Sequence, residues 1–219
     1  MSEEKGRNKK MWKKMNLPNK ITMIRIILVP LFIIAMAVAN VFLDWTWLKF
    51  TALGIYVVAA ITDFIDGYLS RKNNMVTKFG KIMDPLADKL LVSSGFIMLT
   101  GVGILPAWIT AIIIFRDFFV NALRMFGSDN GKDVAAVLSG KIKTIFQLIG
   151  VPLALLGFAL FGADQAYFGL FLTGSVNMGL AELLINVGMS VAITAAVIAT
   201  LWSFVEYVMR FKDDVNVEE

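Results

Sequence analysis

The sequence predicts an all-α integral membrane protein: a six-transmembrane-helix bundle with an N-terminal interfacial helix and both termini in the cytoplasm. Hydrophobic residues make up 58% of the 219 residues, against about 45–50% in soluble domains. Apolar stretches recur along the chain, and most approach the ~20 residues that a helix needs to cross a bilayer core of about 30 Å. Their apolar residues do not alternate with polar ones, which favours a helix bundle over a β-barrel.

The expected spans follow one another with polar or glycine-containing joints between them. They are Thr22–Ala39, Trp45–Tyr68, Leu86–Leu99, Ile104–Leu123, Ile142–Phe161 and Leu183–Val208. The joints are Asn40–Asp44, Ser70–Asp84, Gly101–Gly103, Gly127–Lys143 and Gly162–Glu182. The third span is the shortest, and the last joint is long enough to hold a short seventh apolar piece.

The basic residues predict which side of the membrane each joint faces. If the six spans alternate in direction, 20 of the 21 Lys and Arg residues lie near one side and only Lys49 lies near the other. Because cytoplasmic loops are enriched in Lys and Arg, that side is expected to be the cytoplasm of a cell-membrane protein. The expected organisation is a basic amphipathic juxtamembrane segment (1–18), the transmembrane domain (19–210) and a short polar tail (211–219).

Two other interpretations of the N-terminal segment stay open. Its lysines, the apolar run from Ile26 and the small residues Ala37–Ala39 also resemble a cleavable signal peptide. The interleaving of Met11, Trp12 and Met15 with lysines favours an interfacial helix on anionic lipid. A disordered basic tail accounts equally well for the first eight residues.

The chain contains no cysteine and no histidine. Their absence excludes disulfide scaffolds, thiolate metal sites, Cys nucleophiles, the usual zinc ligands and Ser-His hydrolases. Any chemistry must therefore use carboxylates, Lys, Arg, hydroxyl groups or a bound hard cation.

Four aspartates are the main candidates for a reactive site. Asp63 and Asp66 are three residues apart and Asp84 and Asp88 four apart, so each pair shares one helix face. A short link over Ser70–Met83 would bring the two pairs together at the cytoplasmic side. Four anions in one pocket repel one another unless cations are present, and oxygen ligands favour two Mg²⁺ or Mn²⁺ ions, which suit chemistry at phosphorus.

Structural roles for the same residues stay open as well. Asp84 precedes a proline, a sequence typical of a helix N-cap. Gly67 and Gly80 are also typical of close helix packing. Either aspartate of the first pair could form a buried ion pair with Arg71.

The spacing of these residues resembles the signature of the CDP-alcohol phosphotransferase family. Seven of its eight positions agree over 26 residues, and the departure is Ser70, where the family has alanine. The resemblance implies that Asp63, Asp66, Asp84 and Asp88 hold two divalent cations, Mg²⁺ or Mn²⁺, and that Asp88 is also the catalytic base. It implies transfer of a phosphatidyl group from CDP-diacylglycerol to a hydroxyl group. The donor contacts that it implies are Asn19, Thr22, Gly67, Ser70, Arg71, Lys78 and Gly80.

Further segments resemble the branch of this family that uses sn-glycerol 3-phosphate. They are Asn16–Arg25, Arg116-Asp117 and Gly140–Thr144. The candidate contacts to the acceptor phosphate are Arg116, Arg124, Lys141 and Lys143. The alternatives are that Lys141 and Lys143 merely follow the positive-inside rule, or that inositol phosphate, phosphatidylglycerol or serine is the acceptor. The resemblance also implies a homodimer in the lipid bilayer, and no nucleic-acid partner is expected.

A cation transporter is the alternative from a different functional class, since intramembrane carboxylates also serve such proteins. Asp63 lies about seventeen residues into its expected span, ~25 Å from the outer end at 1.5 Å per residue. That position near the inner membrane boundary favours an enzyme supplied from the cytoplasm.

Overall fold

The computed structural model describes residues 17–73, 78–129, 138–166, 168–169 and 179–215, and within these residues it contains six helices and no strand. The helices are α2 (Leu17–Val41), α3 (Thr46–Asn73), α4 (Lys78–Gly101), α5 (Ala107–Asp129), α6 (Leu138–Phe161) and α7 (Leu180–Val215). The all-α prediction is therefore confirmed. The expected interfacial helix lies outside the described residues.

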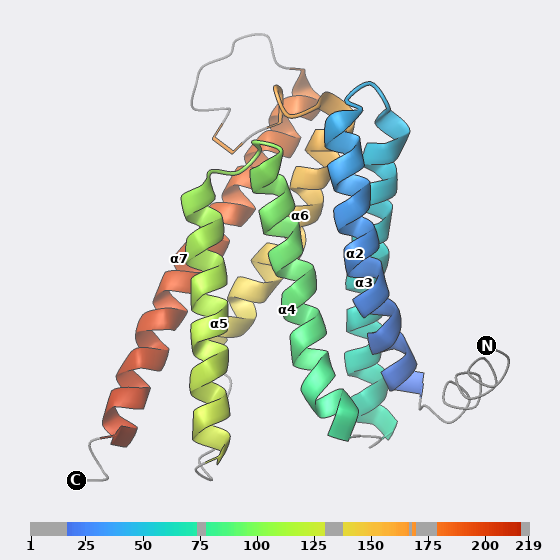
Figure 1. Cartoon of the computed structure of the whole chain (residues 1–219). Coiled ribbons are helices and arrows are strands. Elements are labelled where there is room, and N and C mark those ends of the chain that lie inside the picture. The colour runs from blue at the N-terminus through green and yellow to red at the C-terminus, as the bar shows by residue number, and fades with distance from the viewer. Residues whose placement is uncertain (1–16, 74–77, 130–137, 167, 170–178, 216–219) are drawn as a thin grey trace, which may run out of the picture.

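Successive helices run in opposite directions (Figure 1). The ends of α3, α5 and α7 and the starts of α2, α4 and α6 consequently lie toward one end of the bundle, the lower end in Figure 1. α2 packs on α3 and α4. α6 packs on both α7 and α3, and α5 packs on α7. Residues far apart in the sequence therefore meet at the lower end.

The helices present apolar side chains outward as well as inward. Three of them contain stretches long and apolar enough to cross a membrane, namely Ile21–Val41, Ser139–Phe161 and Leu180–Met209, and shorter apolar stretches cover Thr46–Thr62 and Lys89–Gly101. Large side chains are exposed on these surfaces, for example Trp202 at 71% and Val191 at 58%. Water-soluble proteins rarely expose so much apolar surface, so the fold is that of a membrane protein.

The upper part of the bundle has an apolar core. Phe32, Phe96, Leu99 and Phe158 are buried there, and the Phe32 ring centre lies 5.2 Å from that of Tyr56. The close approach of α3, α4 and α6 depends on Gly95, because a Cβ atom there would lie 2.8 Å from Val151 Cγ1 and 2.9 Å from Tyr56 Cε2. Real Cβ contacts are longer than either distance.

Gly95→Ala is expected to destabilise the bundle, since overpacking costs about 1–3 kcal/mol. Gly54→Ala is the matched control: no atom lies within 4 Å of its Cβ position, and alanine favours a helix over glycine by roughly 0.5–1 kcal/mol. Thermal unfolding in detergent is expected to give a lower Tm for the first variant and an unchanged or higher Tm for the second. An unchanged Tm for Gly95→Ala would contradict the packing described.

Lys49 lies at the upper end, away from the other basic residues that the structure describes. It is buried, its ammonium nitrogen lies 5.0 Å from the centre of the Phe158 ring, and the Cβ position of Gly162 is 3.9 Å away. Gly162 ends α6 with a φ of 80°, a left-handed conformation that suits glycine. The sequence-based placement of Lys49 opposite the cationic end agrees with this geometry.

The helices are longer than the apolar pattern predicted. α3 continues to Asn73 and α4 begins at Lys78, so the link expected over Ser70–Met83 is wrong, and the predicted N-cap Asp84 lies inside α4. Lys and Arg lower the mean hydropathy and interrupt a charge-free run, yet they are good helix formers. The expected tail is also partly helical, because α7 continues to Val215. The possible seventh piece falls largely outside the described residues.

Candidate active site

The helices α3 and α4 carry the predicted signature at the lower end of the bundle. α3 contributes Asp63, Asp66, Gly67, Ser70 and Arg71, and α4 contributes Lys78, Gly80, Asp84 and Asp88. Asp63 lies ten residues before the end of α3 and Asp88 ten residues after the start of α4, so both are about 15 Å from those helix ends. The backbone sets the two aspartate pairs at one depth in two helices that pack together. The side chains of these nine residues lie outside the described part of the structure.

The start of α2 reaches the same region. Thr22 and Arg25 are fully buried one turn apart, and α2 packs on both signature helices. Asn19 lies in the first turn of α2, and its side chain is outside the described part. A buried arginine in a span is costly. The sequence signals for Arg25 were its position in an apolar stretch and its place at the end of the Asn16–Arg25 segment.

A buried cluster of charges joins the signature helix α4 to α5 and α6, with Asp117 at its centre. The ammonium group of Lys143 donates a hydrogen bond to Asp117 Oδ1, and Arg116 Nη1 lies 3.4 Å from the same oxygen. Lys89 Nζ lies 4.0 Å from Asp117 Oδ2. Lys89 follows Asp88 in the sequence, so this contact connects the cluster to the signature.

Burial is nearly complete for three of these four side chains. The side chains of Lys143, Asp117 and Arg116 are exposed by 1%, 3% and 8%, whereas that of Lys89 is exposed by 27%. Three cations share one carboxylate, which leaves the four residues with a net charge of two positive. Cationic groups gathered in this way favour the binding of an anion such as a phosphate group.

α7 supports the cluster from its other side. Arg116 Nη2 donates a hydrogen bond to Ser203 Oγ, and the Arg116 guanidinium carbon lies 5.5 Å from the centre of the Tyr207 ring. Ser139 Oγ, in the first turn of α6, donates to Glu206 Oε2 at 2.9 Å. These contacts fix the start of α6, and thereby Lys143, against α5 and α7.

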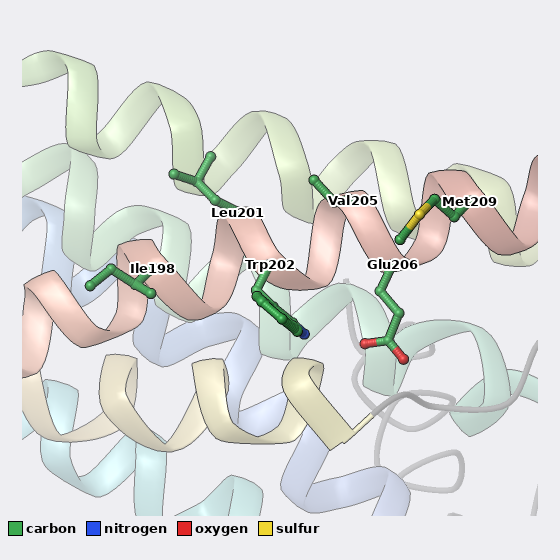
Figure 2. Close-up of a pocket in the computed structure, with 6 residues that line it drawn as sticks. All are labelled: Ile198, Leu201, Trp202, Val205, Glu206 and Met209. Carbon is green, nitrogen blue, oxygen red and sulfur yellow. The ribbon is translucent and has the colours of Figure 1, made fainter.

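Glu206 also lies at the edge of an open apolar hollow of about 650 Å³ along α7. Figure 2 shows its carboxylate and the Trp202 ring on one side of the helix, with Leu201 and Val205 on the other. The lining is otherwise apolar, with Ile198 and Met209 at its ends. Such a surface suits acyl chains of surrounding lipid.

The predicted acceptor contacts do not form one group. Arg116 and Lys143 meet at Asp117, whereas Lys141 is exposed. Arg124 lies in α5 with its side chain outside the described part of the structure. The geometry therefore distinguishes Lys143 from Lys141, although both open the same helix.

No group of three or more acidic side chains is placed to hold a metal ion among the described side chains. The four signature aspartates fall outside that set, so the two-cation site stays a prediction.

The sequence analysis named Arg116 and Lys143 of this cluster as acceptor contacts and missed its other residues. Asp117 was noted only through its place beside Arg116, and Lys89 only as a basic residue near a span end. Ser203 and Tyr207 gave no signal, because their positions become meaningful only when α7 packs on α5. Gln147, one turn after Lys143, is 2% exposed, and its amide nitrogen has no hydrogen-bond partner among the described residues.

The fold and this cluster define a class of protein: a helical membrane protein whose buried charges gather mainly at one end. Comparison with known proteins narrows the class. A profile of the CDP-alcohol phosphatidyltransferase family matches residues 15–202. The chain belongs to this family, as its signature predicted.

Three relatives carry the name CDP-diacylglycerol–glycerol-3-phosphate 3-phosphatidyltransferase. The protein from Bacillus subtilis (strain 168) is 44% identical over 151 residues, 64% of this chain and 77% of the relative. That from Shigella flexneri serotype 5b (strain 8401) is 31% identical over 205 residues, 91% and 97% of the two chains. That from Escherichia coli (strain K12) is 36% identical over 141 residues, 62% and 74% of the two chains.

Proposed function

We propose that this protein is a phosphatidylglycerophosphate synthase. It transfers the phosphatidyl group of CDP-diacylglycerol to sn-glycerol 3-phosphate and releases CMP. The names of the relatives support this activity. The observation that favours a phosphorylated acceptor is the buried cluster of Lys143, Arg116 and Lys89 around Asp117, because such an acceptor needs cations that an uncharged alcohol does not.

The proposed topology has six spans, with both termini and the site on the cytoplasmic side of the cell membrane. The six antiparallel helices and the basic residues at their lower end support it (Figure 1). In this orientation the acyl chains of the donor stay in the bilayer, while the cytidine and glycerol 3-phosphate reach the site from water. We also propose a homodimer, which size-exclusion chromatography with light scattering would test.

The donor set fits divalent cations, since the backbone sets four aspartates at one depth on two packed helices. Asp63, Asp66, Asp84 and Asp88 would hold two Mg²⁺ or Mn²⁺ ions. When bound, the ions neutralise the pyrophosphate and make its phosphorus more electrophilic. Asp88 accepts the proton of the acceptor hydroxyl group as the new P–O bond forms.

The remaining predicted residues divide between the two substrates. The proposed contacts to CDP-diacylglycerol are Asn19, Thr22, Gly67, Ser70, Arg71, Lys78 and Gly80. Arg116 and Lys143 bind the phosphate of the acceptor. Lys141, which is exposed, and Arg124 attract the acceptor to this end of the bundle.

Lys143→Ala is expected to lower kcat/KM for glycerol 3-phosphate by roughly ten- to a hundredfold, because it removes a charge-assisted contact worth ~1.5–3 kcal/mol. Arg116→Ala is expected to have a similar effect, only partly reversed in Arg116→Lys, which lacks the guanidinium fork. Lys141→Ala is the matched control on the same helix and is expected to have a smaller effect. The measurement is steady-state kinetics with each substrate varied in turn. Unchanged acceptor kinetics in both buried variants would contradict this assignment.

The activity itself is tested with purified protein and labelled CDP-diacylglycerol. Glycerol 3-phosphate, inositol phosphate, serine and phosphatidylglycerol are offered separately, and the lipid product and CMP are quantified. We expect CMP and phosphatidylglycerophosphate to form in equal amounts with glycerol 3-phosphate, and no transfer to the other three acceptors. Faster transfer to another acceptor would reassign the substrate within the family. A transporter, the alternative from another class, would release no CMP.

A further inference from the structure

Asp117 is the shared hydrogen-bonding or ion-pair partner of cations from three helices. Its Oδ1 atom faces Lys143 of α6 and Arg116 of α5, and its Oδ2 atom faces Lys89 of α4. The side chain is 3% exposed, so water screens its attraction to these cations only weakly. Asp117 therefore lies where α4, α5 and α6 are connected by charge.

The arrangement has an electrostatic consequence for the acceptor. Three cations brought this close repel one another, and repulsion between partly buried charges is screened less than at a surface. The carboxylate of Asp117 offsets that repulsion. It allows Lys143 and Arg116 to remain within reach of one phosphate group.

The contact with Lys89 has a second, geometric consequence. Lys89 is the next residue after Asp88, so anchoring its ammonium group restrains the rotation of α4 about its axis at that turn. The same carboxylate thus acts on the cations proposed to hold the acceptor phosphate and on the helix turn that carries the proposed base. A fixed spacing between these two groups determines whether the acceptor hydroxyl group meets Asp88.

We propose that Asp117 is a positioning residue that fixes the spacing between the acceptor-phosphate site and Asp88. This inference rests on the proposed function. Asp117 contacts neither substrate in this proposal and acts through Lys143, Arg116 and Lys89. The supporting contacts of Ser203 and Tyr207 to Arg116 hold the outer side of the same cluster.

The test is the kinetics of Asp117→Asn in detergent or nanodiscs. The KM for glycerol 3-phosphate is expected to rise about tenfold or more and kcat to fall, while the KM for CDP-diacylglycerol stays within about twofold. Inorganic phosphate serves as a probe that needs no turnover, and its inhibition constant against the acceptor is expected to rise in parallel. Asp164→Asn removes an exposed carboxylate beyond the upper end of α6 and is the control expected to change none of these constants.

A second arm separates positioning from general support of the fold. Asp117→Glu keeps the charge but moves it by one methylene, so it is expected to fold and to raise the acceptor KM by less than Asp117→Asn. In a Lys143→Met background, Asp117→Asn is expected to raise the KM for glycerol 3-phosphate by a smaller factor than in the wild type. The reason is that part of the effect of Asp117 depends on its contact with Lys143.

The proposal is overturned if Asp117→Asn and Asp117→Glu leave acceptor kinetics unchanged, or if they impair both substrates equally while lowering the Tm. Additive effects of Asp117→Asn and Lys143→Met would overturn the route through Lys143. The wild-type assay separates these outcomes from failure of the proposed function. If the proposed function is wrong, the wild-type protein itself forms no product from glycerol 3-phosphate.

Discussion

Asp88→Asn is expected to reduce turnover at least a hundredfold, within the ~10²–10⁴-fold that an acid–base residue contributes. Asn preserves the volume of the side chain but cannot accept the proton of the acceptor hydroxyl group. Asp88 lies in α4 between the fully buried Ala87 and Lys89, whose ammonium group faces Asp117. The helix around the substitution is therefore held by its neighbours, and binding of CDP-diacylglycerol is expected to persist.

The measurement is kcat at saturating concentrations of both substrates, together with equilibrium binding of the donor to the purified variant. Asp44→Asn is the control, since Asp44 is an exposed acid between α2 and α3 at the opposite end of the bundle. It is expected to keep full activity. Retention of more than about a tenth of the wild-type rate by Asp88→Asn would remove Asp88 from the role of base.

Removal of divalent cations is expected to abolish activity, and Mg²⁺ or Mn²⁺ is expected to restore it. Asp63→Asn and Asp66→Asn should each be inactive even at saturating CDP-diacylglycerol, because loss of one carboxylate leaves the pair of ions with too little negative charge. Binding of Mn²⁺, followed by electron paramagnetic resonance, should weaken in both variants. This readout does not depend on turnover.

Asp164→Asn is the control for these variants. It removes an exposed carboxylate beyond the upper end of α6, away from the signature helices. It is expected to retain activity and cation binding. Full activity of the wild-type protein after exhaustive chelation would overturn the assignment of a metal site.

The helices could be predicted from the sequence because continuous apolar runs report burial in lipid or in the core. Their ends could not. Ser70, Arg71 and Lys78 interrupt the apolar pattern, but they do not interrupt a helix, so α3 and α4 extend beyond the hydropathic boundaries. The propensity of a residue for helix and its affinity for lipid are separate quantities, and hydropathy measures only the second.

The parts of the candidate site that could be predicted are those whose residues lie close together in the sequence. The aspartates of α3 and α4 lie within 26 residues, so their spacing alone revealed them. Arg116 was visible as a charge in an apolar run. The pairing of Lys143 with Asp117 joins residues 26 apart, and that of Arg116 with Ser203 joins residues 87 apart. Such contacts follow from helix packing, which no local pattern contains.

The apolar core above the charged cluster has a consequence for the membrane as an electrical insulator. Buried side chains such as Met36, Phe96, Leu99, Ile113 and Leu155 fill the bundle there. In the proposed topology, ions and protons that enter the site from one face meet a hydrocarbon-like barrier before they reach the other. The protein can gather several charges and a doubly charged substrate within a membrane without providing a leak. Its reaction should then carry no net charge from one side of the bilayer to the other.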